Sequence, residues 1–117
     1  MKKSYDAGLT GEAAAEAFLQ QIGMTLLEKR YRAQDGEIDL IMLDGEIIVF
    51  VEVKYRPHGD SGAGLAAVTR SKQRRMTHAA MDYLQKREYF EHPVRFDVVE
   101  ISRDGITHVP NAFPAIE

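Results

Sequence analysis

Three charged side chains interrupt or end two apolar stretches of the chain, in a pattern that could support metal-dependent chemistry. Asp39 lies within the apolar stretch 36–43, and Glu52 and Lys54 end the apolar stretch 47–54. Two carboxylates that meet on a folded surface can hold a divalent metal ion between them, and a nearby lysine adds positive charge. Burying such acids without a partner is costly, so a metal ion or another cation is expected beside them.

The residues between the two stretches predict how these side chains come together. Asp44-Gly45 is a strong signal for a two-residue hairpin loop, so the two stretches are expected to be antiparallel strands. With that loop, Asp39 pairs with Phe50. Side chains two residues apart along a strand share a face, so Asp39, Glu52 and Lys54 are predicted to point the same way. Asp39 and Glu52 are then diagonal neighbours, with Cα atoms about 7–8 Å apart.

Length and composition favour a small intracellular domain. The chain has 117 residues, which predicts one domain over 1–117, and its hydrophobic content of 44% suits a soluble globular protein. There are no cysteines, which excludes disulfide scaffolds and cysteine-based zinc sites. No apolar run reaches the length of a membrane span, and no apolar region follows the basic N-terminus as in a signal peptide. A cytoplasmic protein without a membrane partner is therefore expected.

The hydrophobic pattern predicts the element order αβββαββ and a mixed α/β domain, with a central sheet flanked by helices. Helices are expected at 10–22 and 69–87, strands at 24–31, 37–43, 47–55, 94–101 and 106–109, and a loop at 57–64. Gly23 is expected to end the first helix. The run 47–53 is apolar on both faces until its end, which indicates a strand at the centre of the sheet. The predicted helical stripes are Ala14, Ala15, Phe18, Leu19 and Ile22, then Val68, Met76, Ala79, Ala80, Tyr83 and Leu84.

Basic residues gather in the middle of the chain, although the net charge is −3. Between residues 54 and 75 one acid, Asp60, stands against Lys54, Arg56, Arg70, Lys72, Arg74 and Arg75. A helical wheel places Arg70 and Arg74 toward solvent, Lys72 within the apolar stripe and Gln73 at its edge. Lys72 and Gln73 either extend past the end of the core or border the site and contact a substrate phosphate. In the second case Arg56, Arg70, Arg74 and Arg75 would follow the flanking nucleic-acid backbone.

These motifs resemble a known family. The stretch Gly36-Glu37-Ile38-Asp39-Leu40-Ile41, followed by Phe50-Val51-Glu52-Val53-Lys54-Tyr55-Arg56, resembles the YraN family of predicted endonucleases. That family is similar to the PD-(D/E)xK nuclease superfamily, and in particular to archaeal Holliday-junction resolvases. The resemblance runs from residues 8–14 to residues 95–99 and implies a restriction-endonuclease-like fold. Ile38 stands where the superfamily motif has proline, which ligates nothing.

The resemblance implies a role for each site residue. Asp39 and Glu52 would be ligands of Mg²⁺ or Mn²⁺, and the carbonyl of Val53 would be a further ligand. Lys54 would position or activate the attacking water. Glu12, on the first helix, would be an auxiliary acid and metal ligand. The helical wheel leaves two positions open for Glu12, one leaning toward the site and one facing water.

The sequence therefore predicts a metal-dependent endonuclease that cleaves phosphodiester bonds in DNA, with branched DNA as the substrate of the related resolvases. The first alternative is a nucleic-acid-binding module without turnover, which would have no use for clustered carboxylates near phosphates. The second is an RNA-processing nuclease. Because the related resolvases act as dimers on two-fold substrates, the resemblance also makes a homodimer one possible assembly.

Overall fold

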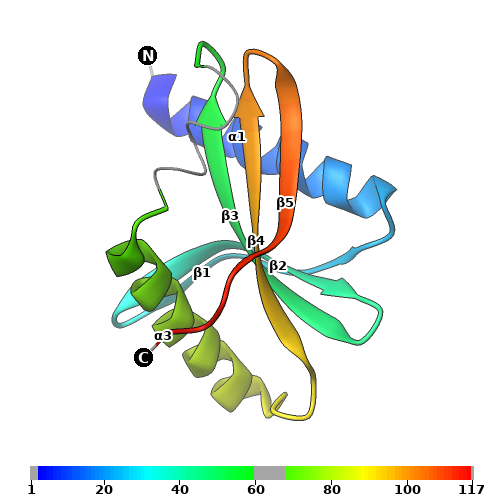
Figure 1. Ribbon diagram of the computed structural model, residues 1–117, viewed down its shortest axis with the longest axis vertical. Coiled ribbons are helices and arrows are strands. Elements are labelled where there is room, and N and C mark those ends of the chain that lie inside the picture. Colours follow the sequence, from blue (N-terminus) through cyan, green and yellow to red (C-terminus); the bar gives the residue numbers. More distant parts are fainter. Residues whose placement is uncertain (1–2, 60–67, 117) are drawn as a thin grey trace.

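The computed structural model describes residues 3–59 and 68–116 of the chain. Within them the predicted order αβββαββ is confirmed (Figure 1). The elements are α1 (Lys3–Gln21), β1 (Thr25–Ala33), β2 (Gly36–Asp44), β3 (Ile47–Arg56), α3 (Arg70–Arg87), β4 (Val94–Ser102) and β5 (Gly105–Phe113).

The strands form one five-stranded sheet between the two helices, in the order β1-β2-β3-β4-β5. All neighbours are antiparallel except β3 and β4, which are parallel because α3 connects them. In Figure 1 α1 crosses behind the sheet and α3 lies on its other side. This three-layer arrangement is the mixed α/β architecture that the sequence predicts, with β3 at the centre of the sheet.

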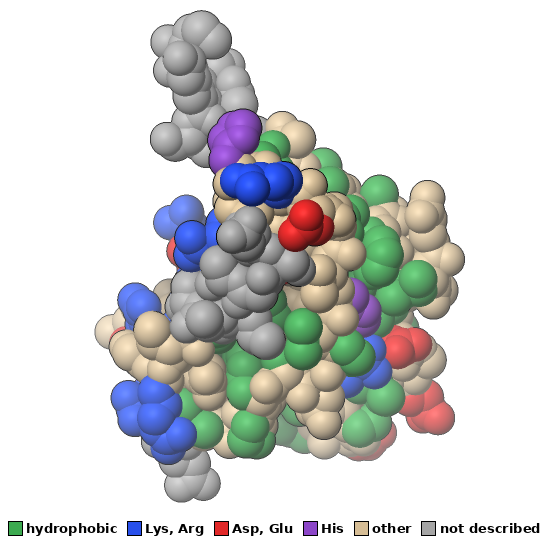
Figure 2. Space-filling model, turned by 45° about the horizontal axis from the view of Figure 1, so that its top comes forward, with side chains coloured by type: hydrophobic (Ala, Val, Ile, Leu, Met, Phe, Trp, Pro, Cys, Tyr) green, Lys and Arg blue, Asp and Glu red, His purple; other side chains and the backbone are tan. Residues whose placement is uncertain are grey.

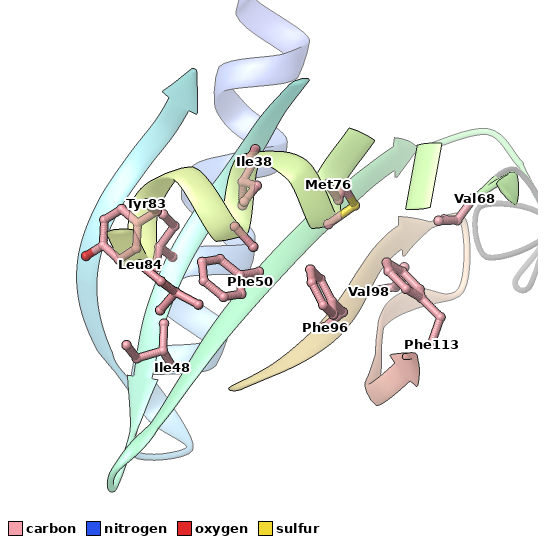
Figure 3. Close-up of a cluster of buried hydrophobic side chains, with 13 residues drawn as sticks. Ile38, Ile48, Phe50, Val68, Met76, Tyr83, Leu84, Phe96, Val98 and Phe113 are labelled. Atoms are coloured by element: carbon pink, nitrogen blue, oxygen red, sulfur yellow. The ribbon is translucent and has the colours of Figure 1, made fainter. Parts of the chain in front are cut away.

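The central strand is buried on both faces, as predicted. Ile48 and Phe50 pack in the core on the α3 side, and Val49 and Val51 pack in the core on the α1 side. Figure 3 shows the α3-side core, in which Phe50 lies among side chains from the helix and neighbouring strands. Each buried side chain of this size contributes about 1.5–3 kcal/mol through loss of apolar surface to water. These two cores hold β3 rigidly, so the residues at its end have a fixed base.

The helices begin and end at identifiable signals. Thr69 precedes α3, and its hydroxyl oxygen accepts the backbone N–H of Lys72 at 3.1 Å. Gly23 has φ +104° after α1, and its N–H donates to the carbonyl of Gln20, as expected for a glycine that ends a helix. The predicted stripe of α3 is buried throughout.

Several predicted boundaries are wrong. The first helix begins at Lys3 rather than at residue 10, and β5 extends from Gly105 to Phe113. Ile22, predicted to be in the core, is 51% exposed because α1 ends one residue before it. Of the predicted loop 57–64, residues 60–64 lie outside the described residues.

The predicted hairpin register is also wrong. Asp44 pairs with Ile47, so the loop is Gly45-Glu46 and Ile41, not Asp39, lies opposite Phe50. Gly45 has φ +62°, which suits a loop whose first residue is glycine, whereas the prediction placed this glycine second. The guanidinium of Arg95 on β4 donates to the Asp44 carboxylate at 3.1 Å and helps to keep Asp44 in the strand. A turn prediction that uses only neighbouring residues cannot include this contact, because Arg95 and Asp44 are far apart in the sequence.

Gly36, at the start of β2, tests how closely the β1–β2 hairpin packs on α3. A Cβ atom at Gly36 would lie 2.3 Å from the carbonyl oxygen of Arg75, which is too close for any side chain. We expect Gly36→Ala to destabilise the protein by about 1–3 kcal/mol in urea unfolding, because the hairpin must move away from the helix.

Gly45→Asn is the matched control at the other end of β2. Nothing lies within 4 Å of a Cβ built there, and asparagine tolerates its positive φ. We expect a change of no more than about 0.5 kcal/mol. Equal losses for the two variants would contradict the close packing of Gly36 on α3.

Candidate metal-dependent site

The candidate site lies where β2 and β3 emerge between the two helices. Glu52 on β3 is only 3% exposed, and it is more deeply buried than the other two acids of the site, Asp39 and Glu12. Its Oε2 atom lies 3.2 Å from the Nζ atom of Lys54, on the same strand, and 3.4 Å from the Nζ atom of Lys72, on α3. Two predicted basic residues therefore meet on one carboxylate oxygen.

Asp39 joins this group through the backbone of β3. The regular pairing of β2 with β3 runs from Asp44/Ile47 to Leu40/Val51. Just beyond it, the backbone N–H of Val53 donates to Oδ2 of Asp39 at 2.8 Å. Continuing the observed register by one residue places Asp39 across from Glu52. The predicted diagonal relation of the two acids is therefore corrected to a direct one.

An irregularity in β1 and β2 sets the position of Asp39. Ile38 and Ile41 both pack in the α3-side core, whereas Leu40 packs on the α1 side. Regular alternation cannot put Ile38 and Leu40 on opposite faces, so the alternation breaks at Asp39. On the neighbouring strand β1, Lys29 pairs with Leu40 and Tyr31 pairs with Ile38. Arg30, between them, has φ +47°, a left-handed conformation. This break places Asp39 within the electrostatic reach of groups on both helices.

Burial and like charge act together on the acids. The pKa of Asp39 is raised to about 7, first by burial and then by the nearby Glu52 carboxylate. The hydrogen bond from Val53 and the charge of Lys72 oppose that rise in pKa. Burial also raises the pKa of Glu12, against the lowering effect of Arg30. A cation bound between Asp39 and Glu52 would relieve this repulsion.

Glu12 lies at the α1 side of the site and is paired. Its Oε1 atom is 3.3 Å from the Nη1 atom of Arg30 on β1. Both Glu52 and Asp39 lie close enough to interact with it electrostatically. Of the two positions that the helical wheel left open, Glu12 therefore takes the one leaning toward the site, with its charge balanced by Arg30.

The donor set fits a magnesium-type ion. Across the described residues, no three acidic or histidine side chains are arranged to hold a metal ion. Mg²⁺ needs fewer, because it is commonly bound by one or two carboxylates together with waters and substrate phosphate. Asp39, Glu52 and the Val53 carbonyl are oxygen donors of the preferred kind.

The other predicted nucleic-acid contacts divide into two groups. Arg56, Arg70, Arg74 and Arg75 are exposed. Gln73 instead donates its side-chain N–H to the carbonyl of Val68 at 3.1 Å, so this donor is engaged at the start of α3. On the face shown in Figure 2, basic side chains gather mainly toward the left, the side on which α3 lies in Figure 1.

A hollow of about 360 Å³ adjoins Lys72 between the β1–β2 turn and the first turns of α3. The sequence does not predict it, because its walls come from two distant segments. Its lining residues are Arg32, Ala33, Gln34, Asp35, Gly36, Glu37, Lys72 and Arg75.

A buried acid that the sequence analysis missed lies beside Lys54. Glu100 on β4 is 2% exposed and pairs in register with Lys54 across the parallel strands. Side chains paired in this way share a face of the sheet. The available signal was an acid near the end of the predicted strand 94–101, a position like that of Glu52 near the end of the predicted strand 47–55.

Sequence comparison gives the family. Residues 11–101 match the model of the family described as "Uncharacterised protein family UPF0102". The chain belongs to the UPF0102 family. The match confirms the resemblance to YraN proteins at the level of the family.

Similar UPF0102 proteins come from several bacteria. The chain is 41% identical to one from Stutzerimonas stutzeri over 97% of this chain and 98% of that protein. It is 44% identical to one from Nitrosomonas eutropha, with 97% of each chain covered. A third, from Geobacter metallireducens, is 42% identical over 91% of this chain and 90% of its own length. None of the helices described for this UPF0102 chain is long and apolar enough to cross a membrane.

The raised pKa of Asp39 predicts how stability depends on pH. The folded protein holds this proton up to about pH 7, whereas the unfolded chain releases it near 3.8. Stability therefore falls as pH rises through that window. In EDTA we expect Asp39→Asn to exceed wild type at pH 8 by on the order of 1–4 kcal/mol, since one pKa unit is about 1.4 kcal/mol. Urea unfolding at pH 8 and pH 5 should show the gain shrinking at the lower pH.

Asp82→Asn provides the control for this titration. The pKa of Asp82 is lowered, first because the Tyr31 hydroxyl donates to its carboxylate. Asp82→Asn should therefore give no gain at pH 8. A gain for Asp39→Asn of the same size at both pH values would show that the charge of Asp39 is not what costs stability.

Proposed function

We propose that this UPF0102 protein is a Mg²⁺- or Mn²⁺-dependent endonuclease that hydrolyses phosphodiester bonds in DNA. The observation that carries the proposal is the meeting of two carboxylates, the half-buried Asp39 and the buried Glu52, with Lys54 at one end of the sheet. The two packed cores fix strand β3, which carries Glu52 and Lys54, so the backbone of the cluster is in place before any ligand binds. A fixed set of charges of this kind is what catalysis of phosphoryl transfer requires.

Each residue has a definite part in the proposed reaction. The second oxygen of Asp39, the Glu52 carboxylate and the Val53 carbonyl would hold the metal ion. The bound ion would lower the pKa of a water and offset charge on the phosphate. Because Asp39 Oδ2 accepts the N–H of Val53, its carboxylate is held in one orientation toward that position.

Lys54 supplies positive charge where the transition state needs it. Its side chain is 21% exposed, so its ammonium reaches both Glu52 and the surface where a substrate would bind. There it would stabilise charge developing on the phosphoryl oxygens and orient the attacking water. Glu12, paired with Arg30, would extend the acidic side of the site and help to orient metal-bound water.

Exposed arginines beside the site favour a nucleic-acid substrate. Arg56 follows the site on β3, and Arg70, Arg74 and Arg75 lie on the first turns of α3. Basic side chains placed this way neutralise backbone phosphates without selecting a sequence. Branched DNA follows from the resemblance to resolvases, which also favours a homodimer that places two such sites on a two-fold substrate.

The main alternative is a nucleic-acid-binding module without turnover. Such a module gains nothing from Asp39 and Glu52, because carboxylates repel phosphate and their partial or full burial carries a desolvation cost. An RNA-processing nuclease would use the same chemistry, so substrate comparison separates it from the DNA enzyme.

A substrate panel tests the proposal. Purified protein is incubated with labelled branched, single-stranded and duplex DNA, and with RNA, in Mg²⁺, Mn²⁺ or EDTA. We expect cleavage of DNA in either metal, none in EDTA, and loss of at least about 100-fold in Asp39→Ala. Circular dichroism checks that the variant is folded. Preferential cleavage of RNA would favour the second alternative, and binding of DNA without any cleavage would favour the first.

Lys54→Ala separates electrostatic stabilisation from metal binding. Removing the ammonium should lower the cleavage rate by about 10²–10³-fold, the usual effect of losing one group that stabilises transition-state charge. Mn²⁺ affinity, measured by titration calorimetry, should be retained, because Lys54 supplies no oxygen ligand. Lys86→Ala is the control, since Lys86 pairs with Asp82 near the far end of α3. Unchanged cleavage in Lys54→Ala would remove this lysine from the mechanism.

A further inference from the structure

Two lysines contact the same oxygen of Glu52, so a metal ion bound to this carboxylate would lie close to two ammonium groups. The Nζ atoms of Lys54 and Lys72 lie 3.2 and 3.4 Å from the same Oε2 atom. A divalent cation bound to Glu52 would face both ammonium groups at short range inside a largely buried site, where charges repel strongly. One of the two lysines must therefore leave when the metal binds.

Of the two lysines, Lys72 is the one whose side chain borders open space. Lys54 lies two residues after Glu52 on the central strand, on the same face of the sheet. Lys72 instead reaches the carboxylate from the first turn of α3, and its side chain forms part of the wall of the 360 Å³ hollow. Because Lys72 already lines the hollow, rotation about its side-chain bonds would carry the ammonium from Glu52 toward it.

The charges of the hollow are nearly balanced before Lys72 enters. Arg32 and Glu37 pair across it at 3.6 Å. Arg75 is exposed and makes no ion pair with any described residue, and Asp35 is the remaining acid of the lining. An ammonium released from Glu52 would leave the hollow with a net positive charge and two adjacent cations, Lys72 and Arg75. Such a pair suits a phosphate group.

We propose that the hollow is a phosphate subsite completed by Lys72, which rests on Glu52 without metal and turns to a substrate phosphate when a divalent cation is bound. The inference rests on the proposed function and names the subsite that holds the neighbouring part of the nucleic-acid backbone. Lys72 then couples the two ligands. Metal binding prepares the hollow for phosphate, and by linkage a bound phosphate strengthens metal binding.

The coupling is measured with Ca²⁺, an oxygen-binding dication. Calorimetry gives Ca²⁺ affinity without DNA, and fluorescence anisotropy gives the affinity for a labelled four-way DNA junction in Ca²⁺ and in EDTA. A gel confirms that the junction stays intact. The variants are Lys72→Gln, the conservative Lys72→Arg, and Lys86→Gln as a control with the same change of charge on the same helix.

We expect Lys72→Gln to bind Ca²⁺ on the order of 5-fold more tightly without DNA, because a competing cation is gone. The factor by which Ca²⁺ strengthens DNA binding should fall at least about 5-fold in the same variant, which is the size of a typical coupling. Lys72→Arg should keep most of the coupling, and Lys86→Gln should match wild type. Loss of a merely structural contact would change Ca²⁺ affinity without abolishing the coupling.

The outcomes separate this inference from the proposed function. If wild type binds Ca²⁺ and DNA but Lys72→Gln keeps the full coupling, or binds Ca²⁺ no more tightly, the role of Lys72 is overturned and the nuclease proposal stands. If wild type binds neither Ca²⁺ nor any DNA, both proposals are overturned together.

Discussion

The hydrogen bond from the backbone of Val53 to the carboxylate of Asp39 is the contact on which the candidate site depends. It forms just where the regular pairing of β2 with β3 stops, so a side chain takes the place of a backbone acceptor. The bond keeps the two strand ends together and holds Asp39 beside Glu52. Without it the two acids would separate, since like charges repel and neither strand pairs further with the other there.

The layers of the fold explain why such an arrangement is stable. β3 is covered on both faces by apolar cores, so the strand carrying Glu52 and Lys54 cannot shift in register without exposing apolar side chains. The parallel neighbour β4 and the connecting α3 bring Lys72 over the same end of β3. Hydrophobic burial thus provides the free energy that holds an electrostatically unfavourable cluster in place.

The buried acid Asp97 shows how a structural carboxylate differs from those of the site. Asp97 on β4 is fully buried and accepts hydrogen bonds from the Arg95 guanidinium and the Asn111 backbone, with His108 Nε2 at 2.7 Å. These partners lock the irregular pairing of β4 with β5. Asp39 has one such donor and a raised pKa, and the charge of Glu52 is compensated by the ammonium groups of two lysines. Asp39 and Glu52, whose charges are less completely satisfied by fixed hydrogen-bond donors, are therefore the acids suited to bind a ligand.

The sequence by itself determined the elements and the residues that could do chemistry. Periodicity is a local property, so the α3 stripe, the doubly buried β3 and the glycine after α1 were predictable from neighbouring residues. The acid–acid–lysine pattern was visible for the same reason. Its register was not, because Gly45 takes the first loop position and Arg95, far along the chain, holds Asp44 in the strand.

Only the tertiary structure decided how these groups are arranged in space. The break in alternation at Asp39, the pairing of Glu12 with Arg30, and the contact of Lys72 with Glu52 each join elements that are distant in sequence. The hollow beside Lys72 exists because Gly36 lets the β1–β2 turn approach α3 closely. Such contacts depend on packing and charge balance among several elements at once, and no local pattern encodes them.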